Sequence, residues 1–177
     1  MNAGAAAASG DILVFLHADT RLPQDAFSSV RSALKEPGAE SGTFRLRFDE
    51  ESPILRLYGF ATHLPLPQIC FGDRALFVRR TVFEEIGGFP EIPIFEDLEM
   101  ARLLHRRGGF HFLLQHATTS ARRFLHVGPI RQQLRNTYLW CHFMLRTDPL
   151  SVARHYSYEI SLHAPTSNLK EAQHADL

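Results

Sequence analysis

Two acidic positions in different contexts are the residues of this chain best suited to chemistry. Asp19 follows an apolar run at residues 12–16, and the pair Glu96 and Asp97 follows a Gly-Gly-Phe-Pro segment at residues 87–90. A carboxylate can hold a divalent cation against a diphosphate, and a second carboxylate can accept a proton from an incoming nucleophile. Two carboxylates with separate tasks therefore predict a group-transfer reaction.

The segments around these acids predict the elements that position them. Residues 12–16 are apolar without period-two alternation, which is typical of a strand buried on both faces. Ligands of open α/β sheets bind outside the carboxyl ends of such strands, and Asp19 falls at that place. Asp97 falls in the first turn of a predicted helix that ends at Gly108. The two acids are thus expected at a strand end and a helix start.

The rest of the chain predicts alternating helices and strands. Helices are expected over residues 3–9, 24–35, 53–63, 82–86, 96–107, 129–146 and 149–160, and strands over 12–16, 43–48, 75–78, 110–114 and 117–120. Apolar residues alternate with arginines over 43–48, a pattern typical of a strand covered on one face. Residues 161–177 show no sustained pattern, which predicts a disordered tail.

Several motifs together resemble family-two glycosyltransferases with the GT-A fold. Residues 13–20, ending in His-Ala-Asp-Thr, are similar to the D-x-D segment of that family, and residues 87–89 with 95–99 are similar to its G-G-F…E-D-x-E segment. Residues 1–5, 17–23, 72–73 and 119–124 extend the resemblance to a bacterial subgroup, the radical-SAM/selenodomain-associated transferase 2 proteins. The similarity runs from Met1 to about Tyr156.

The resemblance implies a partial domain. Members of the family begin with a βαβαβ half that binds the base and ribose of the nucleotide, and residues 1–4 match a segment inside the family domain. The expected fold is an α/β, GT-A-like mixed sheet, related to the Rossmann fold, with flanking helices and an N-terminal truncation. It is expected to cover residues 1–160 and to be helical from about residue 129.

On the donor side, the resemblance implies a metal site. Asp19 is expected to bind Mn²⁺ or Mg²⁺ with the donor diphosphate, because these cations prefer oxygen ligands. The first acid of the D-x-D segment is replaced by His17, which either contacts the nucleotide or packs, and Ala18 lies between the two in the same substrate-binding segment. His126 is a candidate further metal ligand, since a C-terminal histidine completes the site in many GT-A enzymes.

On the acceptor side, Asp97 is expected to be the catalytic base of an inverting transfer. Glu96 would orient the acceptor or Asp97, and Gly88 is counted among the substrate-binding residues of the same segment. Asp73 is expected to hydrogen-bond sugar or acceptor hydroxyls. A simpler interpretation of Asp97 is an acid stabilised by the helix dipole, with no catalytic role.

A basic pair, Arg122 and Arg123, follows the last predicted strand. Guanidinium groups match phosphate oxygens in geometry and charge, so this pair is a candidate for neutralising the leaving diphosphate. The alternative is that one arginine pairs with an acid and the other is exposed. Family members that polymerise sugars have a Q-x-x-R-W sequence at a comparable place, and its absence argues against a processive synthase.

Composition limits the partners. Lys+Arg and Asp+Glu both count 19, so no global field attracts nucleic acid or an acidic membrane, and binding must depend on local sites. The two cysteines, Cys70 and Cys141, lie far apart and give no disulfide framework, which fits a cytoplasmic protein. The amphipathic, basic helix expected from residue 129 carries Trp140. Such a helix either covers the domain or lies on a membrane surface near a lipid-linked acceptor.

The sequence therefore predicts a metal-dependent, inverting glycosyltransferase that moves a sugar from a nucleotide-diphosphate sugar to an unknown acceptor. Two other classes remain open. A non-catalytic remnant or interaction module would keep the core pattern without binding a nucleotide sugar. A metal-dependent phosphohydrolase would use Asp19 and Asp97 to cleave phosphate esters without a sugar acceptor.

Overall fold

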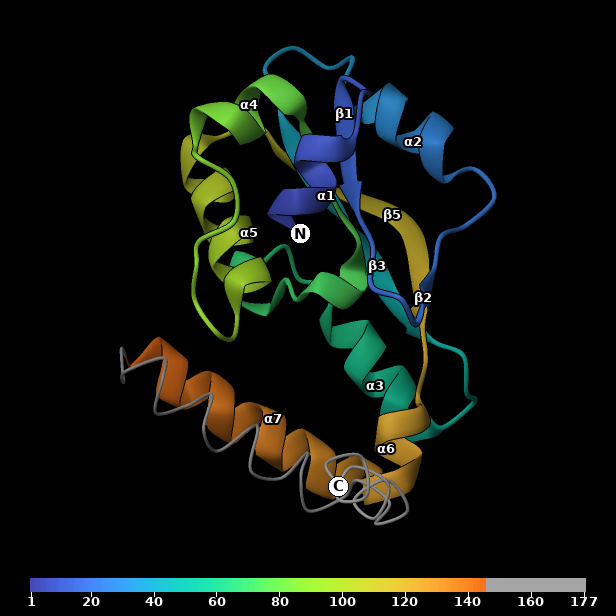
Figure 1. Ribbon diagram of the computed structural model, residues 1–177. Helices are drawn as coiled ribbons and strands as arrows, with labels where there is room; N and C mark the ends of the chain where they lie inside the picture. Colours follow the sequence, from blue (N-terminus) through green and yellow to red (C-terminus); the bar gives the residue numbers. More distant parts are fainter. Residues whose placement is uncertain (146–177) are drawn as a thin grey trace, which may run out of the picture.

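The computed structural model describes residues 1–145, in which helices flank a five-stranded mixed sheet (Figure 1). The strands are β1 (Ile12–Phe15), β2 (Thr20–Arg21), β3 (Ser41–Phe48), β4 (Leu76–Arg79) and β5 (Phe110–Thr119), in the spatial order β1-β4-β3-β5-β2. Strands β3 and β5 are parallel, and the other neighbouring pairs are antiparallel. The predicted α/β mixed sheet is confirmed.

Seven α-helices and two short 3₁₀ helices connect these strands within residues 1–145. The α-helices are α1 (Asn2–Ala7), α2 (Ala26–Ala33), α3 (Pro53–Ala61), α4 (Arg80–Glu85), α5 (Glu96–Arg107), α6 (Arg122–Val127) and α7 (Pro129–Met144). The 3₁₀ helices are η1 (Pro67–Ile69) and η2 (Gly72–Arg74). The predicted helix at 149–160 and tail at 161–177 lie outside the described residues.

The core lies on both faces of the sheet. On one face, α1, α4 and α5 pack on β1 and β4 around the buried Val78 and Met100. On the other face, α2 packs around the buried Val30 and Phe77. A third cluster joins α3 to the end of β3 through the buried Leu55. The side chains of successive residues of β4 thus point to opposite faces of the sheet, as the pleat of a β-strand requires.

The predicted strand at residues 12–16 is covered on both faces, since Leu13 and Phe15 pack in one core cluster and Ile12 and Val14 in the other, but it is shorter and less buried than expected. Strand β1 forms at Ile12–Phe15, but Leu13 is its one buried residue, and Leu16 lies beyond the strand and is 42% exposed. The physical reason is its position at the edge of the sheet, where it pairs only with β4. The carboxyl end of β1 nevertheless leads into the loop that carries Asp19.

The last predicted strands are also revised. The predicted strands at 110–114 and 117–120 are one strand, β5, which ends at Thr119, because backbone pairing with β3 continues through this region despite a register shift between Thr43 and Arg45. The short elements β2 and α6 were not expected from the sequence. In β3 the predicted alternation is confirmed: Leu46 and Phe48 are buried, and Arg47 is exposed.

Candidate active site

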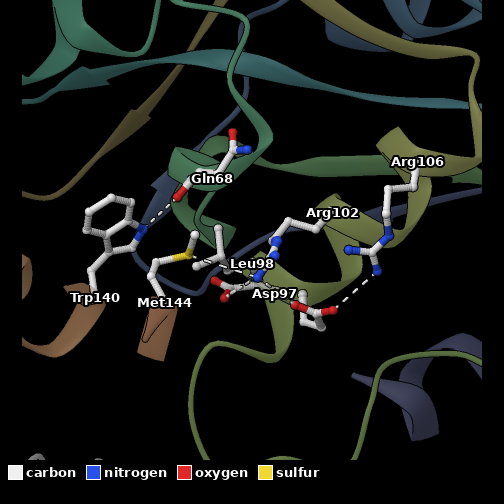
Figure 2. A network of polar contacts seen from close by, with 8 residues as sticks. Gln68, Asp97, Leu98, Arg102, Arg106, Trp140 and Met144 are labelled. Carbon is white, nitrogen blue, oxygen red and sulfur yellow. Dashed lines mark hydrogen bonds and ion pairs between the residues drawn. The ribbon is translucent and has the colours of Figure 1, made fainter. Parts of the chain in front are cut away.

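Three segments supply the candidate active site: the loop after β1, the 3₁₀ helix η2 and the first turn of α5. Asp97 is the second residue of α5 and lies beside Leu98 (Figure 2). Its Oδ1 accepts a hydrogen bond from the Leu98 N–H at 2.7 Å, and its Oδ2 accepts one from the Gly72 N–H. The carboxylate therefore ties the start of α5 to η2.

Gly72 lies between His17 and Asp97. A Cβ atom at this position would fall 2.8 Å from Oδ2 of Asp97 and 2.9 Å from Cε1 of His17. Real Cβ atoms do not approach other atoms so closely, and backbone and side chains would have to shift to accept one. Glycine thus permits the loop after β1 and the start of α5 to meet at η2.

Asp73 adds a second carboxylate beside that of Asp97. Its Oδ1 is buried and has no hydrogen-bond partner among residues 1–145, although the residue as a whole is half-buried. Burial raises the pKa of the Asp73 carboxyl to about 6; the charges of Asp97 and Asp19 act in the same direction, and His17 and Arg74 oppose them. A buried acceptor without a partner is costly, which marks Asp73 as unusual among the described residues.

Arg74 fixes the backbone that carries Asp73. Its guanidinium is buried and donates hydrogen bonds to the Phe44 carbonyl at 3.0 Å, the Thr62 carbonyl at 3.1 Å and the Cys70 Sγ at 3.3 Å. These contacts reach β3 and the end of α3, so η2 is held from several directions. The sequence analysis missed this structural role; an arginine within the largely apolar stretch 69–78 was the available signal.

Two residues next to the site adopt backbone conformations that non-glycine residues rarely show. Ala75, directly after η2, has φ 52°, and Phe95, directly before α5, has φ 63°. Such conformations persist only where the surroundings impose them, and they cluster at functional sites. Both flank the segments joined through Gly72 and Asp97.

The loop of Asp19 is fastened to the end of β5. The Asp19 carbonyl accepts a hydrogen bond from the Ser120 N–H at 3.0 Å, while the Asp19 residue is exposed to solvent. Arg122 and Arg123 follow in the first turn of α6 and are also exposed. The structure thus places the predicted metal ligand and the predicted basic pair on neighbouring backbone segments.

Other predicted residues have different surroundings. A Cβ at Gly88 would lie 2.9 Å from Asn2 Oδ1, and the side chain of Asn2 brackets the adjacent Phe89 backbone with hydrogen bonds of 3.0 and 2.9 Å. These contacts hold α1 against the loop after α4. Ala18 is exposed in the loop beside Asp19, and Glu96 is half-buried at the start of α5.

The residues present fit a divalent cation only in part. His126 lies exposed in the last turn of α6, and among residues 1–145 no group of three or more His, Cys, Asp or Glu side chains is arranged to hold a metal. Mg²⁺ and similar cations are commonly bound by one or two carboxylates with substrate phosphates completing the coordination. Asp19, exposed and close enough to influence Asp73, fits that type of site.

Helix α7 borders the same region. The Trp140 Nε1–H donates to the Gln68 carbonyl at 2.7 Å, and Arg102 Nη1 lies 3.9 Å from the Met144 sulfur (Figure 2). The rings of Phe143 and Phe95 lie 5.0 Å apart. The inner face of α7 therefore contacts η1, which precedes η2 in the chain, and the residue directly before α5, the helix that carries Asp97.

A mixed sheet with flanking helices is the architecture of a GT-A-like fold. The chain belongs to glycosyl transferase family 2, whose family model matches residues 1–90. No curated protein sequence matches the chain. The predicted family is confirmed, while the radical-SAM-associated subgroup stays a prediction.

Among solved structures, the fold is similar to the mannosyltransferase PcManGT from Pyrobaculum calidifontis, determined in complex with GDP-Man and Mn²⁺. The TM-score is 0.56 and the sequence identity is 17%, over 87% of this chain and 46% of the archaeal protein. The chain thus spans about half the length of that enzyme. Within residues 1–145, no helix is both long and apolar enough to cross a bilayer.

Proposed function

We propose that this chain takes part in the transfer of a sugar from a nucleotide-diphosphate sugar to an acceptor hydroxyl, with inversion at the anomeric carbon. One observation carries the proposal: Gly72 lets His17 and Asp97 meet, with the unpaired carboxyl oxygen of Asp73 beside them. Group transfer needs a donor site and a base within reach of one reacting centre. In this proposal, the segments gathered at η2 would supply both.

In this proposal, Asp97 accepts the proton of the acceptor hydroxyl. Each of its carboxylate oxygens already accepts one backbone hydrogen bond, from Leu98 or Gly72, and each keeps a further lone pair. The two backbone contacts hold the carboxylate in one orientation, as a positioned base requires. Asp73 would accept a hydrogen bond from a sugar or acceptor hydroxyl, and Glu96 would orient the acceptor.

On the donor side, we propose that Asp19 holds Mn²⁺ or Mg²⁺ and that His17 and Ala18 contact the nucleotide. The cation would neutralise charge on the leaving diphosphate when bound. Arg122 and Arg123, next along the chain after Ser120, would contact the same phosphates.

Replacing Asp19 by alanine is expected to abolish metal-dependent nucleotide binding. Calorimetry with Mn²⁺ and a set of nucleoside diphosphates should detect binding to the wild type and none to Asp19→Ala. Asp11→Ala is the matched control, because Asp11 is an exposed acid at the opposite end of β1. Equal affinity in Asp19→Ala and the wild type would contradict the metal role.

Release of the nucleoside diphosphate from nucleotide sugars separates this proposal from the alternatives. A transferase should consume a nucleotide sugar in a Mn²⁺-dependent manner and leave phosphate monoesters intact. Hydrolysis of p-nitrophenyl phosphate with no consumption of nucleotide sugars would instead support a phosphohydrolase. A chain that binds no nucleoside diphosphate would support the non-catalytic remnant.

Asp73→Asn is expected to raise stability and lower activity. Since the folded-state pKa is about 6 and the model value is 3.8, the unfolded chain ionises first, so wild-type stability falls as the pH rises from about 4 to 6. Above pH 6, the variant should therefore have a free energy of unfolding roughly 1–3 kcal/mol higher than that of the wild type. Its melting temperature should be correspondingly higher. The difference should vanish below pH 4.

Thermal melts across this pH range, with transfer assays on the same preparations, check that expectation. A variant that gains stability and keeps full activity would show that Asp73 does not contact substrate. A variant whose melting temperature equals that of the wild type at every pH would contradict the burial of the charged carboxylate.

A further inference from the structure

Helix α7 has apolar side chains on two opposite faces. Leu139 on the inner face is buried, whereas Ile130, Leu134 and Tyr138 are 64%, 67% and 52% exposed. These three residues follow one another at four-residue spacing and therefore form a line along the helix. Leu145, the capping residue, lies seven residues beyond Tyr138 and is 80% exposed. We call Ile130, Leu134, Tyr138 and Leu145 the outer stripe.

A surface helix normally has one apolar face and one polar face. The high exposure of the outer stripe means that no described element covers it. Apolar side chains scattered singly on a surface are ordinary, but a continuous line of them marks an interaction surface. The outer stripe therefore calls for a partner with an apolar region.

The charge around the stripe indicates what that partner is. Helix α7 itself contains no aspartate or glutamate and carries two arginines, Arg131 and Arg135. Arg131 and Arg135 each directly follow a residue of the stripe, so they border it along one side. Arginine stems can lie along an apolar surface while the guanidinium stays at a polar boundary.

We propose that the outer stripe of α7 docks on an anionic lipid bilayer, with its apolar side chains below the head groups and the bordering arginines at the lipid phosphates. An apolar face with a basic border is the pattern of interfacial helices. A second copy of the chain fits less well, because two α7 helices packed face to face would bring the positive charges that border their stripes together.

Docking would also set the position of the active site. The inner face of α7 contacts the Gln68 carbonyl and the ring of Phe95, so the helix is fixed to the segments that flank η2 and Asp97 (Figure 2). A bilayer bound to the outer stripe would lie on the opposite side of the same helix. The consequence that the acceptor is lipid-linked rests on the proposed function, whereas the docking itself does not.

Vesicle flotation with the full chain, without any donor, tests the docking. The wild type is expected to float with vesicles of phosphatidylcholine mixed with phosphatidylglycerol, and much less with phosphatidylcholine alone. Leu134→Ser should weaken binding to the mixed vesicles by about tenfold or more, the effect of losing one buried leucine. Leu114→Ser is the matched control, because Leu114 on β5 has the same exposure of 67% and should have no effect.

A charge variant tests whether the bordering arginines contact the lipid phosphates. Arg131→Gln should weaken binding by about fivefold at low salt, since each basic residue near an anionic surface contributes a similar amount. Arg31→Gln, at an exposed position of α2, is its control and should bind as the wild type does. Equal melting temperatures of all four variants show that they are folded.

Three results would overturn the inference. Leu134→Ser and the wild type could bind mixed vesicles equally, or the wild type could bind both vesicle types equally. In the third case, sedimentation without lipid would reveal a dimer that Leu134→Ser breaks and Leu114→Ser does not. That last result would assign the outer stripe to a second copy of the chain.

Discussion

Asp97→Asn is expected to keep the fold and lower the rate of glycosyl transfer by roughly 10²- to 10⁴-fold, the usual contribution of a positioned general base. The amide is nearly isosteric with the carboxylate, but it has one acceptor oxygen instead of two. Either the Gly72 N–H or the Leu98 N–H therefore loses its partner, which costs about 1 kcal/mol of stability. The rate must accordingly be measured per folded molecule.

Glu99→Gln is the control for this variant. Glu99 lies in the same first turn of α5 and pairs with Arg102 at 3.2 Å and Arg106 at 3.3 Å. Its replacement removes a negative charge from the helix start, with a similar effect on the helix dipole of about 0.3–1 kcal/mol, and should leave turnover intact. If Asp97→Asn turns over as fast as Glu99→Gln, Asp97 is a structural acid and not the base.

Gly72→Ala is expected to damage both stability and activity, because the added Cβ collides with His17 and with Oδ2 of Asp97. Overpacking of this kind typically costs about 1–3 kcal/mol. Displacement of the base by even 1 Å can lower a rate by about 10²-fold. Chemical denaturation and transfer assays on the same preparation measure the two effects.

Gly4→Ala controls for the backbone effect of losing a glycine. Gly4 lies in α1, and a Cβ there would meet nothing within 4 Å, so this variant should be neutral or slightly stabilising. A second variant, Gly72→Ala with His17→Ala, removes one side of the collision and should recover part of the lost stability but not the activity. Wild-type stability and turnover in Gly72→Ala would refute the close approach.

Local patterns in the sequence were sufficient for much of the fold. The helix predicted over residues 82–86 corresponds to α4, and the two glycines that follow it, Gly87 and Gly88, have φ of 80° and 79°, a conformation that glycine adopts readily. The apolar run at 12–16 correctly predicted a strand. Its position at the edge of the sheet could not be predicted, because hydrophobic periodicity describes the strand itself and not which strands lie beside it.

The sequence nominates candidate site residues one by one, but it does not give their arrangement. Asp73 and Asp97 were each expected to contact substrate, yet the contact of Gly72 with both His17 and Asp97 depends on tertiary packing between segments far apart in the chain. The buried role of Arg74 depends in the same way on carbonyls of β3 and α3. Residue types suggest chemistry, whereas hydrogen-bond partners become known only once the chain is folded.

We propose that Asp19, Asp73 and Asp97 belong to one site that binds a nucleoside diphosphate with a divalent cation. Paramagnetic line broadening by Mn²⁺ in backbone NMR spectra tests it directly, because broadening falls off steeply with distance from the ion. With a nucleoside diphosphate present, the amide signals of Asp19, Gly72 and Leu98 should broaden together in the wild type and stay sharp in Asp19→Ala. Broadening confined to other parts of the chain, or unchanged in Asp19→Ala, would contradict the account.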